Sequence, residues 1–210
     1  MQASQERPLG AMHQASVIAM LGGECTGKTK LAQSLAHTFK LGYVPETLRL
    51  FVEEHQRSPR QDEQEAILTA QCDAIGKALC RLDRVPNGPL LICDSSPWMT
   101  AIYSLQYFGD TGLFAKAKRL MLDLAEAYCF HWLHFHCADD IAWQADGVQR
   151  DGPGQRARSR LLIAHYPPLR GAIGHERVEL IEGGFEQRLT LVRSMLAGQG
   201  SDRFNPLRSD

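Results

Sequence analysis

The sequence predicts an α/β fold in which about five parallel strands are flanked by helices. Short apolar runs alternate along the chain with segments whose apolar residues recur at three- and four-residue spacing, as strands and helices do. The first run, 17–21, is apolar throughout, which indicates a strand buried on both faces. The 210 residues, 44% hydrophobic and 22% charged, have the size and composition of one globular domain.

The remaining elements follow in alternation. Pro97 favours a helix start, with Ser95 or Ser96 near its cap, and 86–89 break the chain before the third strand. Parallel strands end at a common edge, where such sheets bind ligands. Strands are expected over 17–21, 41–46, 90–94, 131–137 and 178–181, and helices after Thr29 and over 47–54, 63–82, 97–108, 113–128 and 185–196.

The turn after the first strand, GGECTGKT at 22–29, fits the pattern G-x-x-x-x-G-K-[ST]. In that pattern backbone N–H groups hold the β-phosphate of a nucleotide, Lys28 bridges the β- and γ-phosphates, and Thr29 ligates Mg²⁺. The motif predicts a P-loop NTPase fold that binds ATP and Mg²⁺; a Gly-rich turn without a ligand is the alternative. The expected nucleotide-binding residues of the turn are Gly22, Gly23, Glu24, Cys25, Thr26, Gly27, Lys28 and Thr29.

Two expected strands end at a carboxylate beside this turn. Asp94 follows the strand at 90–94 and is expected to hold Mg²⁺ directly or through water, together with Thr29. Glu46 ends the strand at 41–46 and is expected to accept or orient the acceptor hydroxyl, so that Lys28, Glu46 and Asp94 are candidate catalytic residues. The alternatives are a strand-end cap for Asp94, and a solvated acid or a partner of Arg49 for Glu46.

Residues 138–160 are expected to form a lid. A Gly/Pro-rich middle is flanked by Arg150, Arg156, Arg158 and Arg160, and such a mobile segment can close over phosphates and exclude water. We expect Arg150 to act in catalysis and Arg156 to bind the nucleotide. A solvated basic loop is the alternative.

Cys25 stands inside the phosphate-binding turn. The helix N-terminus and Lys28 favour its thiolate, so we expect it to react faster than a thiol in an apolar strand such as Cys93. An inert residue chosen for its size is the alternative.

The rest of the chain limits the function classes. His131, His134 and His136 suggest core or strand-edge histidines more than a metal site, since only His134 and His136 share a strand face. The net charge of −1 argues against nucleic acid and membrane partners, and the six cysteines without a C-x-x-C pair fit a cytoplasmic protein. A flexible arm is expected over 1–15, the P-loop domain over 16–197 and a flexible tail over 198–210.

Four segments in order, MLGGECTGKTKLA, VPETLRLF, ICDSSPWMTAIYSLQYFG and WQADGVQRDGPGQR, resemble the ribosylnicotinamide kinase domain of NadR-type proteins and its AAA-like P-loop relatives. The resemblance covers about 16–197 and implies ATP-dependent phosphorylation of nicotinamide riboside to nicotinamide mononucleotide. Ser96 stands where the family commonly has a second acid. Pro45 and Thr47 stand where some members have aromatic residues suited to the pyridinium ring, for which Tyr43, Trp98, Tyr103 and Tyr107 are possible substitutes.

The function predicted from the sequence is therefore an ATP-dependent small-molecule kinase for NAD salvage, with nicotinamide riboside as the leading acceptor. One alternative is a regulatory or partner-binding module that binds or slowly hydrolyses ATP, favoured by the loss of the second acid. Another is a kinase of a different nucleoside or small metabolite.

Overall fold

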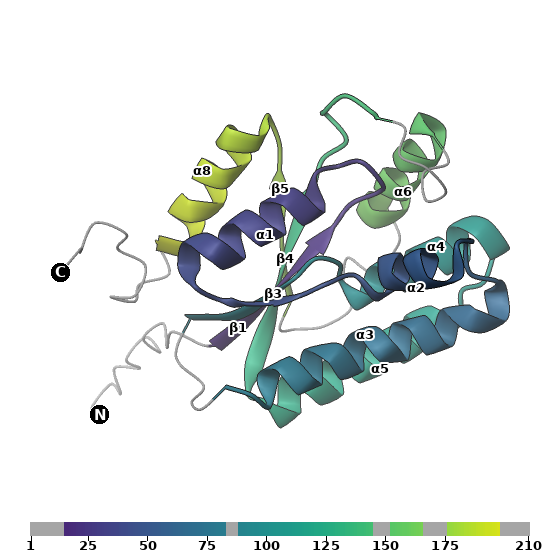
Figure 1. The fold of residues 1–210 in the computed structure, drawn as a ribbon, viewed down its shortest axis with the longest axis horizontal. Coiled ribbons are helices and arrows are strands. Elements are labelled where there is room, and N and C mark those ends of the chain that lie inside the picture. Colours follow the sequence, from purple (N-terminus) through teal and green to yellow (C-terminus); the bar gives the residue numbers. More distant parts are fainter. Residues whose placement is uncertain (1–14, 83–87, 145–151, 166–175, 198–210) are drawn as a thin grey trace, which may run out of the picture.

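Five parallel strands form a single sheet in the order β2-β3-β1-β4-β5. The computed structural model describes residues 15–82, 88–144, 152–165 and 176–197 (Figure 1). The sheet confirms the predicted fold class. Its strands are β1 (Ala15–Leu21), β2 (Gly42–Val44), β3 (Gly88–Cys93), β4 (Phe130–Cys137) and β5 (Glu176–Ile181).

Helices cover both faces of this sheet (Figure 1). On one face lie α1 (Lys28–Phe39) and α8 (Phe185–Ala197), and on the other α3 (Gln64–Leu79), α4 (Pro97–Phe108) and α5 (Gly112–Ala127). The helix α2 (Thr47–His55) follows β2, a 3-10 turn (Gln61–Glu63) precedes α3, and α6 (Pro153–His165) packs against α4.

The central strand β1 is buried along its whole length. Val17 and Leu21 face the core under α3 to α5, whereas Ile18 and Met20 face the core under α1 and α8. Side chains alternate between the faces of a strand, so an apolar run of this kind can fill two cores at once. The predicted strand buried on both faces is therefore correct, and it begins at Ala15.

The carboxyl ends of β1, β2 and β3 are linked by backbone hydrogen bonds. The N–H of Ser96 donates to Met20 O at 2.8 Å, and the N–H of Asp94 donates to Val44 O at 2.9 Å. These bonds hold the segment after β3 against the ends of its two neighbouring strands. Asp94 is thereby fixed at the sheet edge from which the turn at 22–27 leaves β1.

The segment expected to be a Gly/Pro-rich lid contains more regular structure than the sequence analysis foresaw. The helix α6 begins at Pro153, inside the expected 138–160, and continues to His165. A proline is favourable in the first turn of a helix, and the pattern from there on has helical spacing. The expected arm lies outside the described residues except Ala15, which belongs to β1, and the tail lies outside them entirely.

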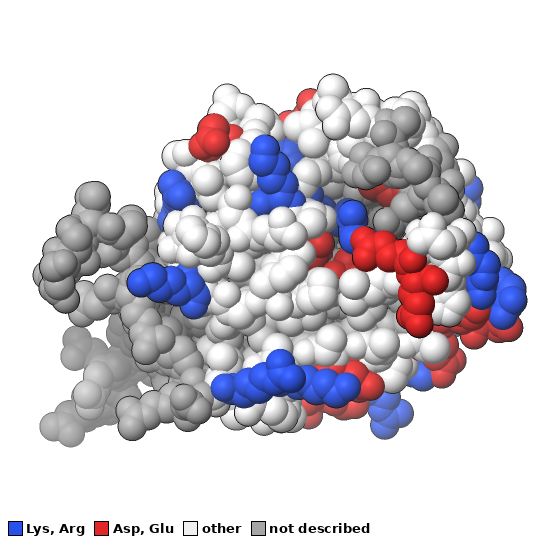
Figure 2. Space-filling model, viewed as in Figure 1, with Lys and Arg blue, Asp and Glu red and all other residues white. Residues whose placement is uncertain are grey.

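Surface charge is mixed rather than one-sided. Lys and Arg side chains are interspersed with Asp and Glu over the face in Figure 2, in keeping with a net charge of −1. Among the described residues, no helix has both the length and the apolar character that crossing a bilayer requires.

The two-sided core predicts how stability depends on α1. Leu35→Ala removes a fully buried side chain and should lower the free energy of unfolding by about 2–5 kcal/mol. Leu50→Ala, at a side chain of α2 that is 47% exposed, is the matched control and should cost within about 0.5 kcal/mol. Urea titration measures both values, and equal losses would contradict this description of the core.

Candidate functional site

Residues 22–29, here called the phosphate loop, turn sharply between β1 and α1. Gly22, Cys25 and Gly27 have φ angles of 141°, 56° and 80°, in the region that favours glycine. A Cβ atom on Gly22 would lie 2.8 Å from the carbonyl oxygen of Cys137, at the end of β4. The loop therefore needs glycine at position 22 both for its backbone angles and for its approach to β4.

The lysine of the motif lies folded against the loop. Its Nζ atom donates to the carbonyl oxygens of Gly22 at 2.7 Å and Gly23 at 2.8 Å, and the lysine is 7% exposed. The hydroxyl of Thr26 also donates to Gly23 O, at 2.8 Å. The carbonyl groups of Gly22 and Gly23 are therefore satisfied by donors within the loop itself and at the start of α1.

A cavity of about 490 Å³, here called the loop cavity, lies over the phosphate loop. One wall is formed by the start of α2, a second by Tyr103 of α4 and a third by the segment after β4. Its described lining residues are Glu24, Cys25, Thr26, Gly27, Lys28, Thr29, Lys30, Glu46, Leu48, Arg49, Tyr103, Ile141, Ala142 and Gln144.

Glu46 belongs to the wall of this cavity and is buried, at 6% exposure. Burial raises the pKa of its carboxyl above the usual 4.5, and the nearby Asp94 acts in the same direction. Lys28, Arg49 and a hydrogen bond to Ser95 oppose that rise. A carboxylate whose proton affinity is increased by burial is suited to receive a proton from a hydroxyl group.

Asp94 is 1% exposed and only half satisfied. Its Oδ2 atom accepts a hydrogen bond from Tyr43 at 3.0 Å, whereas Oδ1 has no partner among the described residues. The guanidinium of Arg49 donates to the Thr29 hydroxyl at 3.5 Å. A buried carboxylate oxygen without a partner is costly, so Asp94 and the Thr29 hydroxyl fit the chemistry of a Mg²⁺ site.

A second cavity, of about 320 Å³, adjoins the first and shares Glu24, Leu48 and Tyr103 with it. Its wall is more apolar and includes Tyr107 and Phe108, so we call it the aromatic cavity. Two substrates placed in these cavities would therefore meet at a common wall. The described lining of the aromatic cavity is Glu24, Leu48, Val52, Ser58, Pro59, Gln64, Tyr103, Tyr107 and Phe108.

The four aromatic candidates from the sequence separate into two groups. Tyr103 and Tyr107 line the aromatic cavity, with ring centroids 6.2 Å apart. Trp98 is 1% exposed and belongs to the hydrophobic core. The hydroxyl of Tyr43 donates a hydrogen bond to Asp94. Burial is the larger cause that raises the pKa of Tyr43, and the Asp94 carboxylate is the next.

The guanidinium of Arg156, on α6, contacts the backbone of the phosphate loop. Its guanidinium donates to the carbonyl oxygens of Cys25 at 3.3 Å and of Ile141 at 2.9 Å. A Cβ atom on Gly23 would lie 3.1 Å from Arg156 O, so α6 and the loop are in close contact. Arg156 thus lies at the phosphate loop, and its binding of a nucleotide stays a prediction.

The other candidate arginines have different surroundings. Arg158 is exposed, and Nε of Arg160 lies 3.4 Å from Oδ2 of Asp139. Arg150 lies outside the described residues, so its catalytic role stays a prediction.

Sequence reasoning missed Arg188, which reaches the phosphate loop from α8 and is 2% exposed. Its guanidinium donates to Thr26 O at 2.5 Å, Gly183 O at 2.7 Å and Ala138 O at 3.0 Å, and it pairs with Asp140. Because it lies 162 residues after Thr26, no local pattern marks it.

The histidines of β4 are largely internal. His134 is fully buried with Nε2 3.1 Å from Ser96 Oγ, and burial lowers its pKa to about 3. Ser96 also accepts from the N–H of Trp98 and so caps α4. Burial lowers the pKa of His136 to about 4. Over the described part of the chain, no three His, Cys, Asp or Glu residues form a group that could hold a metal ion.

Comparison with known families agrees with this arrangement. A family model described as an AAA domain matches residues 17–188, which include the phosphate loop, Glu46, Asp94 and Arg188. Compared by sequence, the chain matches none of the curated proteins.

Two solved structures have a similar fold. NadR protein in complex with NAD and AMP-PNP has a TM-score of 0.53 and 16% identity over 88% of this chain and 50% of its own. Thymidylate kinase from Candida albicans has a TM-score of 0.51 and 12% identity over 91% of this chain and 93% of its own. The chain thus spans half the length of the NadR protein. The similarities show a P-loop kinase-like fold.

The loop geometry predicts a difference between thiols. Cys25 is partly exposed and its Sγ accepts from the N–H of Gln144 at 3.1 Å. Burial raises the pKa of Cys72 to about 12 and raises that of Cys93 well above its usual value. An alkylating reagent should therefore label Cys25 at least about tenfold faster than Cys72 or Cys93. Peptide mapping by mass spectrometry measures the rates.

Mg²⁺ with ATP should slow labelling of Cys25 and leave the exposed Cys80 unchanged as an internal control. Labelling of Cys25 that does not respond to nucleotide would contradict the assignment of the loop.

Proposed function

The chain belongs to the AAA-domain family, and from that premise we propose that it is an ATP-dependent kinase of a small molecule, with nicotinamide riboside as acceptor. The observation that carries the proposal is the buried carboxylate of Glu46 in the wall of the cavity over the phosphate loop. A protein that only binds a nucleotide has no need for a proton acceptor at that place.

ATP would occupy the loop cavity with its phosphates on the phosphate loop. Lys28 would then exchange the carbonyl groups of Gly22 and Gly23 for phosphate oxygens. Thr29 and Asp94 would hold Mg²⁺, which neutralises charge on the β- and γ-phosphates. The Oδ1 atom of Asp94, which has no partner among the described residues, supports this role.

The acceptor would occupy the aromatic cavity, with its hydroxyl group toward Glu46. The hydroxyl oxygen forms a bond to the γ-phosphorus while the bond from that phosphorus to the bridging oxygen of ADP breaks. The hydroxyl proton passes to the Glu46 carboxylate, whose raised pKa favours its uptake. The products are ADP and the phosphate ester of the acceptor.

Nicotinamide riboside is favoured by three observations. The four sequence segments resemble ribosylnicotinamide kinase domains, and NadR is among the proteins with a similar fold. The aromatic cavity offers Tyr103 and Tyr107 as surfaces for a flat ring. The second candidate function, an ATP-dependent regulatory module, is favoured by Ser96, which caps α4 where the family commonly has an acid.

An acceptor panel tests the proposal. Protein with ATP and Mg²⁺ should convert nicotinamide riboside to its 5′-phosphate faster than it converts common nucleosides. If only another nucleoside is phosphorylated, the chain is still a kinase, but nicotinamide riboside is not its acceptor. Hydrolysis of ATP that is independent of every acceptor would favour the regulatory module.

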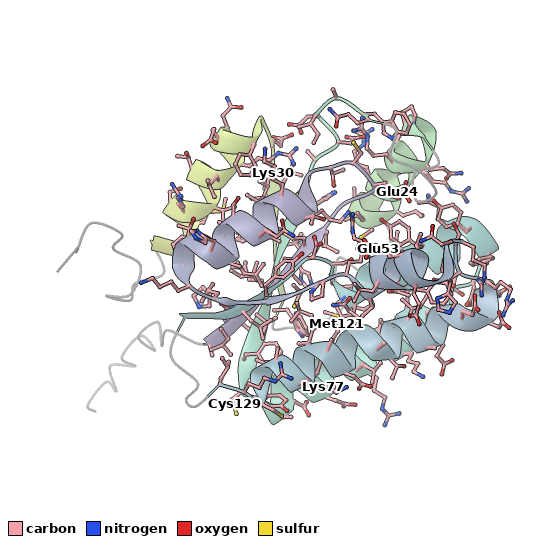
Figure 3. All side chains as sticks on the ribbon, in the orientation of Figure 1. Glu24, Lys30, Glu53, Lys77, Met121 and Cys129 are labelled. Atoms are coloured by element: carbon pink, nitrogen blue, oxygen red, sulfur yellow. The ribbon has the colours of Figure 1, made fainter. Side chains whose placement is uncertain are left out.

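Lys28→Ala should lower kcat by at least about 10²-fold, because it removes the positive charge from the transferring phosphoryl group. Lys77→Ala is the matched control, since Lys77 is exposed on α3 and lies well away from the loop residue Glu24 (Figure 3). Steady-state kinetics measure both variants. If Lys28→Ala is nearly as active as the control, the phosphate loop does not take part in catalysis as proposed.

Glu46→Gln should lower kcat by about 10²–10⁴-fold and change ATP affinity little, because Glu46 handles the acceptor proton. Burial raises the pKa of Glu46, so the active carboxylate forms only at higher pH, and kcat should rise with pH through a midpoint above 4.5. The pH profile of the variant should lack this rise.

Glu53→Gln, at an exposed carboxylate on α2, the helix that begins directly after Glu46, is the control for the Glu46 variant (Figure 3). An equal loss of kcat and ATP affinity in Glu46→Gln would assign Glu46 to the nucleotide instead of the acceptor.

A further inference from the structure

Arg188 joins three segments that are distant in the sequence. Its guanidinium donates to Thr26 O of the phosphate loop, to Ala138 O after β4 and to Gly183 O after β5. Asp140 completes the arrangement, because it pairs with Arg188 and accepts from the N–H of Gly183 at 2.5 Å. The five N–H donors of a guanidinium suit such a meeting point of several acceptors.

The charge of Arg188 is compensated where it lies. Burial alone would raise the pKa of the Asp140 carboxyl, but the N–H of Gly183 and the Arg188 guanidinium lower it below its usual value. Arg188 is 2% exposed, so its donors face protein acceptors instead of water. A buried cation of this kind persists only when it is paired and hydrogen-bonded, as it is here.

The contact with Thr26 determines the direction of a peptide group. A trans peptide is planar, and its carbonyl oxygen and N–H point in opposite directions. With Thr26 O held toward Arg188, the N–H of Gly27 must point away from Arg188, and Gly27 lines the loop cavity. In the same way Arg156 holds Cys25 O and directs the N–H of Thr26.

The second contact acts on the wall of the same cavity. Ala138 and Asp140 lead directly into Ile141 and Ala142, which line the loop cavity. Arg188 therefore fixes both the phosphate loop and the segment that faces it. The aromatic cavity has none of these contact residues in its described lining.

We propose that Arg188 is a positioning residue for the nucleotide, which holds the Thr26–Gly27 peptide so that its N–H faces the phosphates. The proposal rests on the proposed function in one respect, that the ligand of the phosphate loop is a nucleotide. None of the described contacts of Arg188 reaches the aromatic cavity. Loss of Arg188 should therefore weaken nucleotide binding and leave acceptor binding unchanged.

Arg188→Lys tests this role. Lysine keeps the charge but presents its donors from one point, so it cannot serve Thr26 O, Ala138 O and Gly183 O together. The Kd of Mg-ADP, measured by isothermal titration calorimetry, should rise about tenfold, and KM for ATP should rise while KM for the acceptor stays unchanged. Arg193→Lys, on the same helix and bonded to Thr38 at 3.2 Å, is the control.

Asp140→Asn is the second variant and keeps the size of the side chain at a residue that is 35% exposed. It weakens the pairing of Arg188 and should raise the Kd of Mg-ADP about threefold. If circular dichroism shows that Arg188→Lys does not fold, Asp140→Asn becomes the test of the proposal. An unchanged Kd of Mg-ADP in Asp140→Asn then overturns it.

The outcomes separate the proposal from its premise. A wild-type protein that binds no Mg-ADP overturns the proposed function. Wild-type binding of Mg-ADP with an equal Kd in folded Arg188→Lys overturns the role of Arg188 alone. Equal rises in KM for ATP and for the acceptor also overturn it, because they indicate general damage to the fold.

Discussion

The burial of β1 between two helical layers is the constraint on which the rest of the structure depends. β1 pairs with both β3 and β4 and fills a core on each face, so its carboxyl end has a fixed position. The phosphate loop begins at that end, so its position is set by a strand that is buried along its whole length. Loops that bind and react are commonly positioned by a rigid scaffold in this way.

Around that fixed end, cationic side chains donate hydrogen bonds to the carbonyl groups of the phosphate loop. Lys28 donates to the carbonyl oxygens of Gly22 and Gly23. Arg156 of α6 donates to Cys25 O, and Arg188 of α8 donates to Thr26 O. Where a loop carbonyl group is held by a protein donor, the N–H of the same peptide points the other way, and N–H groups that converge in this manner attract an anion. Anion binding is thus prepared by contacts that do not themselves touch the ligand.

Local patterns in the sequence predicted the fold class, which the sheet confirms, and marked the candidate site residues, whose roles stay predictions. The phosphate loop is marked by spacing, and Glu46 and Asp94 by their places just after apolar runs, because both signals lie within a few residues. The expected strand at 41–46 is shorter in the structure, where β2 ends at Val44 and Glu46 lies at the start of α2. Arg188 was missed because its contacts arise only when α8 packs beside the loop. The start of α6 was missed because Gly152 to Gly154 resemble a loop, although Pro153 opens a helix packed on α4.

The shared wall between the two cavities has a consequence for ligands that span both. Glu24, Leu48 and Tyr103 border the loop cavity and the aromatic cavity alike, so the two volumes lie side by side. One molecule that joins a polyphosphate to an aromatic group would lose its translational freedom once, where two separate ligands lose it twice. Its affinity would then exceed that of either fragment through effective concentration, and its optimal linker length would measure the separation of the two subsites in solution.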